Sequence, residues 1–117
     1  MPKNNRFFIA LAAFLLITGC EPKRFSPEVL SNGVRYFYHD PTALSISVAG
    51  SFNHWNPEIN RLSGPDASGI WTILLPLQPG RYEYRFVVNG SNWVLDPSAP
   101  SVDDGMGDRN SIVDVPN

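Results

Sequence analysis

Two tryptophans on predicted loops are the side chains of this chain best placed to bind a ligand. Trp55 ends the run Ala-Gly-Ser-Phe-Asn-His-Trp at 49–55, and Trp93 follows the turn sequence Asn89-Gly90. Both lie among turn residues and outside any apolar stripe, so we expect their rings to face solvent. A large ring is costly to leave in water and suits contact with another flat surface. The pair therefore indicates a site for a flat ligand.

The remaining residues give little support to catalytic or metal chemistry. His39 and His54 are far apart in sequence, and no Ser-His-Asp signature accompanies them. The acidic run 103–108 does not have EF-hand spacing, which favours a solvated acidic turn over a calcium site. Gly105 and Gly107 do not complete a dinucleotide fingerprint. We expect no enzyme activity, no metal ion and no cofactor.

The first 19 residues have the pattern of a bacterial lipoprotein signal peptide. Lys3 and Arg6 precede an apolar run of about a dozen residues, shorter than the roughly 20 that a membrane-spanning helix needs. The run ends in Ile-Thr-Gly-Cys at 17–20, which resembles a lipobox, where cleavage leaves the cysteine thiol joined to diacylglycerol. Cys20 is the only cysteine, so it has no partner for an intramolecular disulfide. A spanning helix and an ordinary signal with an incidental cysteine are the alternative interpretations.

Lipidation of Cys20 predicts a protein anchored in the bacterial cell envelope. Buried acyl chains contribute about 0.8 kcal/mol per CH₂, and the several chains of a lipoprotein anchor suffice for stable attachment. Glu21 is not the aspartate that favours inner-membrane retention in many two-membraned bacteria, so the periplasmic side of the outer membrane is favoured. Residues 20–32, which include Pro22 and Pro27, are predicted to be a tether to a domain spanning 33–117.

The charge balance argues against nucleic acid as a partner. The chain has nine basic and 11 acidic residues. Two of the basic residues, Lys3 and Arg6, lie in the predicted signal peptide, which leaves seven against the same 11 acidic ones. A domain of net negative charge lacks the basic surface that phosphate backbones require.

From Gly33 onward, hydrophobicity follows the period of two that is typical of β-strands. Strands are predicted at 34–39, 44–49, 70–75, 81–88 and 111–115. Leu44, Ile46 and Val48 alternate with small residues, which predicts a half-buried strand. In 81–88 the aromatic residues share one face, and Arg85 lies on the other. Because no segment has a clear helical period, the predicted fold class is all-β, a small antiparallel β-sandwich.

A series of motifs in this order resembles a glycogen-binding module. The motifs lie at 48–55, 69–71, 79–90, at Trp93 with Asp96-Pro97, and at Asn110-Ser111. The family is the early-set, immunoglobulin-like domain of AMP-activated protein kinase β subunits, isoamylases and branching enzymes, known as carbohydrate-binding module family 48. The resemblance covers about 34–115. It implies an immunoglobulin-like sandwich that binds α-glucans such as glycogen or maltodextrin.

The resemblance implies sugar contacts for six residues. They are Trp55, Arg85, Trp93, Met106, Asp108 and Asn110. The two tryptophans would stack on glucose rings, although Trp93 comes one residue later than in the kinase subunit. Arg85 and Asn110 would hydrogen-bond to hydroxyls, and the glucan would curl around Met106. The kinase subunit has leucine and threonine in place of Met106 and Asp108, so Asp108 brings a charge where the family has a hydroxyl.

Each of these assignments has a structural alternative. Trp55 could cap the open end of the sandwich, Arg85 could pair with Glu83 or another surface acid, and Asn110 could form a turn before the last strand. Trp71, within a strand, is predicted to be core. The leading hypothesis is a membrane-tethered, non-catalytic α-glucan-binding module. A protein-interaction module for an envelope partner, using the same aromatic residues, and an inert spacer are the alternatives.

Overall fold

The computed structural model describes residues 25–117, which fold as an all-β domain. Cys20, the predicted signal peptide and the start of the predicted tether lie outside the described residues. Within 25–117 the chain forms no helix, and so none that is long and apolar enough to cross a membrane. Two antiparallel sheets pack into a sandwich, which confirms the predicted fold class.

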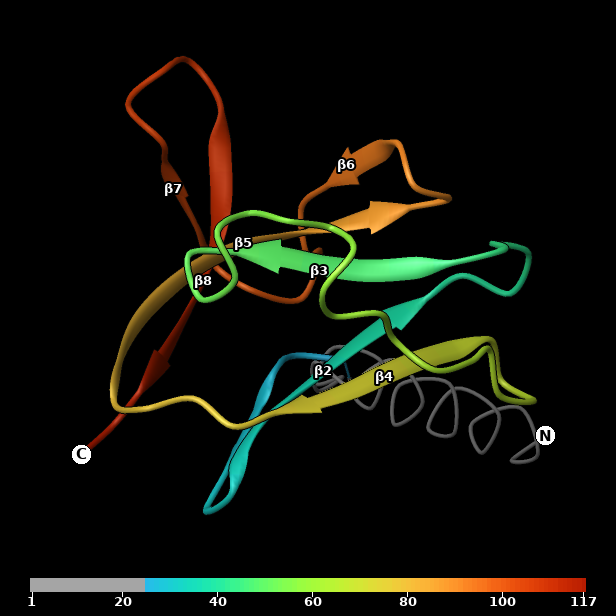
Figure 1. The fold of residues 1–117 in the computed structure, drawn as a ribbon, viewed down its shortest axis with the longest axis horizontal. Helices are drawn as coiled ribbons and strands as arrows, with labels where there is room; N and C mark the ends of the chain where they lie inside the picture. Colours follow the sequence, from blue (N-terminus) through green and yellow to red (C-terminus); the bar gives the residue numbers. More distant parts are fainter. Residues whose placement is uncertain (1–24) are drawn as a thin grey trace, which may run out of the picture.

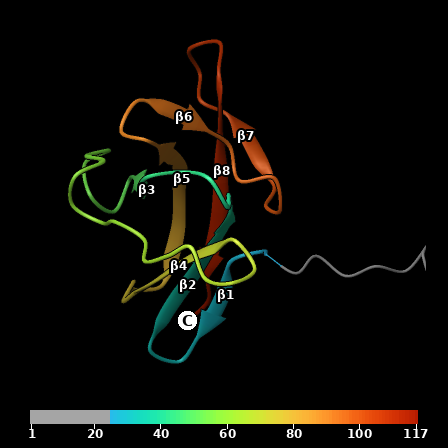
Figure 2. The same ribbon diagram turned by 90° about the vertical axis from the view of Figure 1, so that its right-hand side faces the viewer.

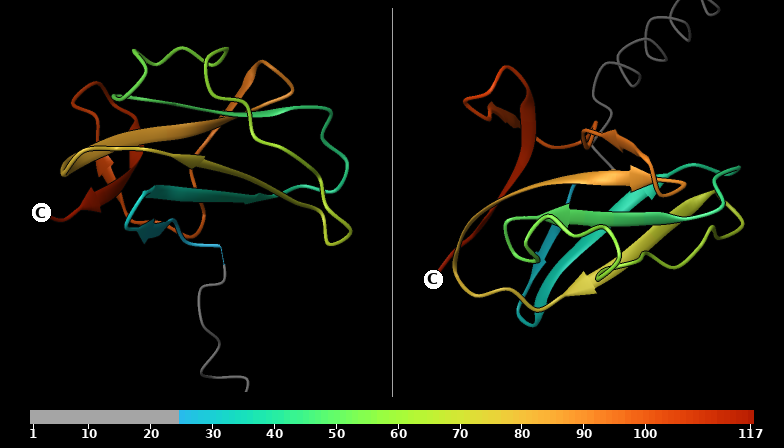
Figure 3. Two further views of the ribbon diagram at one scale, coloured as in Figure 1. Left: turned by 60° about the horizontal axis from the view of Figure 1, so that its bottom comes forward. Right: turned by 45° about the horizontal axis from the view of Figure 1, so that its top comes forward.

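Eight strands make up the two sheets (Figure 1). They are β1 (Glu28–Leu30), β2 (Gly33–His39), β3 (Ile46–Gly50), β4 (Ile70–Leu75), β5 (Gly80–Val88), β6 (Asn92–Val94), β7 (Ser101–Asp103) and β8 (Arg109–Val115). The smaller sheet has the order β1-β2-β4, and the larger has the order β3-β5-β8-β7 with β6 also paired to β5. Figures 2 and 3 show the two sheets as separate layers. Strand β5 is the centre of the larger layer.

Aromatic rings from both sheets form the middle of the core. Tyr36 of β2 and Tyr84 and Phe86 of β5 are fully buried. The rings of Tyr36 and Tyr84 meet edge to face with centroids 4.9 Å apart, a favourable arrangement for aromatic pairs. Trp71 is also buried, and its indole Nε1 donates to the carbonyl oxygen of Asp40 at 2.7 Å. The predicted core role of Trp71 is therefore confirmed.

Strand β3 differs from the half-buried strand that its alternation predicts. Leu44 lies before the strand and is 88% exposed, whereas all five residues from Ile46 to Gly50 are buried. Ser47 and Ala49, on the outer face, are small and lie beside the longer Val87 and Arg85 of β5, so solvent reaches little of them. The predicted start at residue 44 and the predicted half burial are both wrong.

Three short strands are not predicted by the pattern of hydrophobic residues. Strands β1, β6 and β7 have three residues each, too few for a period of two to be recognised. Strand β1 lies within the range 20–32 predicted as a tether, yet it pairs with β2 through Val29 opposite Val34 and Leu30 opposite Gly33. The smaller sheet therefore extends into that range.

A buried polar network fixes the turn that follows β6. The hydroxyl of Tyr84 donates to Asp96 Oδ2 at 2.7 Å, and the backbone N–H of Ser98 donates to Asp96 Oδ1 at 2.9 Å. The backbone N–H of Asp96 donates to Ser111 Oγ on β8 at 2.8 Å. Burial raises the pKa of Asp96, while the hydrogen bonds from Tyr84 and Ser98 oppose that rise. Asp96-Pro97 thus has a structural role, because Asp96 ties the turn to β5 and β8.

Alkaline pH is expected to destabilise the domain through its two buried core tyrosines. Burial raises the pKa of Tyr36 and Tyr84 above the ordinary value of 10.0, and the charge of Asp96 adds to the effect. Below pH 10 the folded and the unfolded chain both keep the protons of these two hydroxyls, so the free energy of unfolding has its full value. Above pH 10 the unfolded chain loses protons that the folded chain retains, so the free energy of unfolding falls by about 1.4 kcal/mol per pH unit per tyrosine.

Urea unfolding between about pH 8 and about pH 11 measures this slope. Tyr36→Phe is the matched variant, because the buried hydroxyl of Tyr36 has no hydrogen-bond partner in the described part of the chain. The variant should fold at least as well as the parent at pH 8 and lose stability about half as steeply above pH 10. An unchanged slope would exclude Tyr36 as a source of the effect.

Candidate functional site

The candidate site lies on the outer face of the larger sheet and is centred on Arg85 of β5. Strand β3 flanks one side of β5, with Ala49 opposite Arg85. The other side of β5 is shared by β8, opposite Gly80 to Tyr84, and β6, opposite Phe86 to Val88. Paired residues of antiparallel strands project to the same face. Trp93, opposite Val87, therefore shares the face of Arg85, two residues further along β5.

Trp55 reaches this face from a tight loop after β3. The carbonyl oxygen of Gly50 accepts the backbone N–H groups of Asn53 at 3.1 Å and of Trp55 at 2.9 Å. His54 and Trp55 have φ angles of 59° and 58°, in the left-handed region that side chains other than glycine rarely adopt. A Cβ atom on Gly50 would lie 2.5 Å from the carbonyl oxygen of Glu83 on β5. The glycine thus lets the loop begin in close contact with β5.

The side chain of Asn53 holds this loop in place. It is only 5% exposed, and its Oδ1 accepts the backbone N–H of Gly50 at 2.9 Å. Its Nδ2 donates to the carbonyl oxygen of Val48 at 2.9 Å and to Asn60 Oδ1 at 2.8 Å. The Asn53 amide therefore supplies hydrogen-bond partners for two backbone groups on the edge of β3 and joins the start of the loop to Asn60. Sequence analysis gave Asn53 no role beyond membership of the 48–55 motif.

Trp93 is positioned by the hairpin between β5 and β6. Asn89 and Gly90 have φ angles of 53° and 79°, and the N–H of Ser91 donates to the carbonyl oxygen of Val88 at 3.3 Å. Positive φ at both central residues is what a type I′ turn requires, so the predicted tight turn is confirmed. Asn89 Oδ1 also accepts the N–H of Leu44 at 2.7 Å, which ties the hairpin to the chain before β3. Trp93 is 39% exposed.

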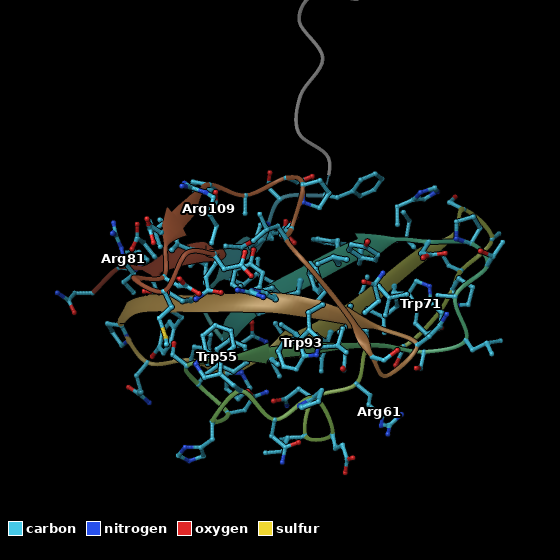
Figure 4. The ribbon with its side chains drawn as sticks, turned by 90° about the horizontal axis from the view of Figure 1, so that it is seen from above. Trp55, Arg61, Trp71, Arg81, Trp93 and Arg109 are labelled. Atoms are coloured by element: carbon cyan, nitrogen blue, oxygen red, sulfur yellow. The ribbon has the colours of Figure 1, made fainter. Side chains whose placement is uncertain are left out.

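The two tryptophans and Arg85 line one groove of about 260 Å³. Its lining residues are Trp55, Arg85, Trp93, Asp104 and Asn110. In Figure 4, which looks onto this face, Trp55 and Trp93 lie side by side over the larger sheet, and Trp71 lies well away from them. A hollow of about 520 Å³ between the β1–β2 and β4–β5 turns is larger, but no aromatic or charged side chain lines it. The smaller groove is therefore the better candidate site.

Arg85 is held by partners from the β7–β8 hairpin. Its Nε donates to Asn110 Oδ1 at 2.8 Å, and its Nη2 lies 3.2 Å from Asp108 Oδ2 and 3.6 Å from Asp104 Oδ2. Asn110 in turn donates from Nδ2 to Glu83 Oε1 at 3.0 Å. The structural alternative for Arg85, pairing with Glu83 or another surface acid, is therefore confirmed in its second form: the partners are Asp108 and Asp104, and no ion pair with Glu83 is formed. Asn110 lies within β8 and is buried, so its alternative role as a turn former is wrong.

Asp104 is the lining residue that sequence analysis missed. Its side chain is 19% exposed, and its Oδ1 accepts the N–H groups of Met106 at 2.7 Å and of Asp108 at 3.1 Å. These backbone hydrogen bonds, joined by the charge of Arg85, lower the pKa of Asp104. The run 103–108 is an exposed turn, as predicted, that folds around the one half-buried carboxylate of Asp104. The Asp-Gly-Met-Gly-Asp sequence, typical of such side-chain-capped turns, was the available signal.

Met106 and Asp108 lie outside the groove lining. Met106 is at the tip of the loop and 89% exposed, while Asp108 contacts the site through its ion pair with Arg85. In residues 25–117 no group of three or more His, Cys, Asp or Glu side chains is arranged to hold a metal ion. The groove pairs two flat apolar rings with an arginine, an amide and a carboxylate. Such a surface suits a ligand that has apolar faces and a rim of hydroxyl groups.

Comparison with known proteins assigns the chain to a family. Residues 36–117 match the family described as the glycogen recognition site of AMP-activated protein kinase. Among curated proteins, the chain is 34% identical over 61 residues to the 1,4-alpha-glucan branching enzyme GlgB of Picrophilus torridus, a match covering 52% of this chain and 9% of the enzyme. It is 35% identical over 74 residues to the chloroplastic protein PTST of Arabidopsis thaliana, covering 61% of this chain and 26% of that protein.

A third relative, the chloroplastic PTST homolog 2 of Arabidopsis thaliana, is 32% identical over 72 residues, or 62% of this chain and 13% of that protein. The chain thus matches about a quarter or less of the length of these relatives. The family match, in contrast, includes six whole strands, part of β2 and every residue that lines the groove. The chain therefore belongs to the carbohydrate-binding module family of the glycogen recognition site of AMP-activated protein kinase.

Proposed function

We propose that this chain is a non-catalytic module that binds α-glucan chains, such as maltodextrin or glycogen fragments, in the groove centred on Arg85. The observation that carries the proposal is that Trp55 and Trp93, from two separate loops, line one groove together with Arg85. Family membership and the similarity to a 1,4-alpha-glucan branching enzyme support a glucan as the ligand. The lining residues include no nucleophile paired with a base, which supports binding without catalysis.

The chemistry of the groove matches that of a glucose chain. A glucose ring offers a face of C–H bonds, which the indole rings of Trp55 and Trp93 cover, and a rim of hydroxyls. Arg85 uses Nε and Nη2 within the domain, so its Nη1 donors are the ones left for sugar hydroxyls. Two rings and a few exposed hydrogen bonds support a dissociation constant on the order of micromolar to millimolar.

Titration of the purified domain with maltoheptaose, followed by tryptophan fluorescence, tests the proposal. A saturable change is expected, with a weaker response to the β-linked glucan cellohexaose as the control for linkage. The absence of a saturable change with maltoheptaose up to tens of millimolar would refute glucan binding. Together with a crosslinked envelope protein that is lost in Trp55→Ala, that outcome would favour the protein-interaction module.

We further propose that Cys20 carries a lipid anchor that holds the module at the bacterial cell envelope, on the periplasmic side of the outer membrane. The motif at 17–20 and the apolar run before it support this proposal. Palmitate label is expected in the protein produced in a bacterial host and absent from Cys20→Ser. Palmitate label retained in Cys20→Ser would contradict the anchor at Cys20. Labelled protein recovered with the inner membrane would contradict the proposed location.

A further inference from the structure

We propose that Asp104 and Asp108 make the groove selective for uncharged glucan chains over chains that carry phosphate esters. This proposal rests on the proposed function, because it concerns which glucans enter the same groove. Both carboxylates belong to the β7–β8 loop and lie within 3.6 Å of the single guanidinium of the groove. These two carboxylates determine which ligand groups the guanidinium of Arg85 can bind.

The geometry of Arg85 leaves only its Nη1 donors free for a phosphate. Arginine binds phosphate best through two parallel N–H groups of its planar fork. The edge formed by Nε and Nη2 is occupied, since Nε donates to Asn110 at 2.8 Å and Nη2 faces Asp108 at 3.2 Å and Asp104 at 3.6 Å. The Arg85 side chain is itself only 19% exposed. A phosphate could bind the Nε and Nη2 edge only by displacing partners that the loop and β8 hold in place, and a phosphate at Nη1 would approach the same guanidinium that faces both carboxylates.

Backbone hydrogen bonds keep these carboxylates where they are. Asp104 Oδ1 accepts the N–H groups of Met106 and Asp108, and Asp108 Oδ1 accepts the N–H of Arg109 at 2.9 Å. Asp104 is ionised at neutral pH, and its pKa, lowered first by the hydrogen bond from the N–H of Met106, preserves that charge at more acidic pH. The β7–β8 loop therefore presents fixed negative charge beside the rings.

The network around Arg85 also carries more negative than positive charge. Glu83, linked to Asn110 at 3.0 Å, is a third carboxylate in the network around the one guanidinium of Arg85. Arg81 is paired with Asp114 at 2.8 Å, and Arg109 is turned toward β7, where it donates to Ser101. Figure 4 shows Arg81 and Arg109 at the margin of the face, away from Trp55 and Trp93. A dianionic phosphate in the groove would meet a net negative surface.

Coulomb repulsion sets the expected size of the discrimination. A phosphate dianion about 8 Å from two uncompensated charges is expected to weaken binding about fivefold or more near about 20 mM salt. The penalty should shrink to about twofold or less near about 0.5 M salt, where the screening length is only a few ångströms. Binding of an uncharged glucan should change little over the same range, because rings and hydroxyls carry it.

The test compares maltoheptaose with maltoheptaose 6-phosphate by calorimetry, for the parent protein and for Asp108→Asn. Asp108 is suited to substitution because its side chain is 68% exposed, and asparagine keeps the oxygen that accepts the N–H of Arg109. We expect Asp108→Asn to reduce the discrimination about threefold at low salt. Asp114→Asn is the matched control, because it makes the same change of net charge at a carboxylate paired with Arg81. It should leave the ratio of the two affinities unchanged.

The outcomes separate the two proposals. If maltoheptaose binds and its phosphate ester binds equally well or more tightly, the selectivity proposal is overturned and glucan binding stands. If neither ligand binds, the proposed function itself fails. If Asp114→Asn lowers the discrimination as much as Asp108→Asn does, the effect comes from overall charge, and the role given to the β7–β8 loop is wrong.

Discussion

Replacing Trp55 with alanine is expected to weaken binding of maltoheptaose about tenfold or more, which corresponds to at least about 1.4 kcal/mol. Trp55 lines the groove from the rim of a tight loop, and its ring is only half-buried in the free domain. Loss of the ring removes a stacking contact worth about 0.5 to 1.5 kcal/mol and the apolar area that the sugar would cover. Calorimetric titration measures the change without depending on the fluorescence of the lost tryptophan.

Trp71→Phe is the control for Trp55→Ala, because it changes a tryptophan of the core instead of one that lines the groove. Trp71 is buried between the sheets and donates to the carbonyl oxygen of Asp40 at 2.7 Å, outside the groove. This variant should lose about 1 to 3 kcal/mol of stability and keep its affinity for maltoheptaose. Trp55→Ala should show the reverse, with a midpoint of urea unfolding close to that of the parent. If Trp55→Ala and the parent bind maltoheptaose with equal affinity, the groove is not the site of glucan binding.

Much of the larger sheet follows from local sequence pattern. The alternation in 81–88 placed Tyr84 and Phe86 in the core and Arg85 on the outer face, and β5 has this arrangement. The Asn89-Gly90 signal placed the hairpin that carries Trp93. These features depend on neighbours along the chain, so a single sequence contains them. Their expected roles in sugar binding stay predictions.

The surroundings of Arg85 could not be predicted in the same way. Its partner Asn110 is 25 residues away in sequence, and the choice of Asp104 and Asp108 over Glu83 depends on how the β7–β8 hairpin lies across the sheet. Strand β7 has only three residues, so the alternation of hydrophobicity does not reveal that hairpin. A contact that depends on how β8 pairs with an unrecognised strand is visible only in the folded structure.

Asn53→Ala is expected to cost about 3 to 5 kcal/mol of stability and to remove glucan binding with it. The substitution leaves the N–H of Gly50 and the carbonyl oxygen of Val48, both on β3, without their partner. Each buried polar group left unsatisfied costs about 1 to 3 kcal/mol, and the bond to Asn60 is lost as well. Without this amide, the left-handed conformations of His54 and Trp55 lose their support. The stability loss is measured by urea unfolding and the affinity by titration with maltoheptaose.

Asn56→Ala makes the same substitution three residues further along the loop and separates the two effects. The side chain of Asn56 is exposed, and its Oδ1 accepts only the N–H of Glu58, at 2.9 Å. Loss of this surface contact should cost less than about 1 kcal/mol and leave the affinity for maltoheptaose within about twofold of the parent. Because Asn53→Ala is strongly destabilising, its affinity is measured in sucrose at low temperature, where the folded fraction is verified by circular dichroism. Misplacement of the Trp55 ring must weaken its contact with the sugar. If folded Asn53→Ala binds maltoheptaose as tightly as Asn56→Ala, then Asn53 stabilises the fold but does not position Trp55.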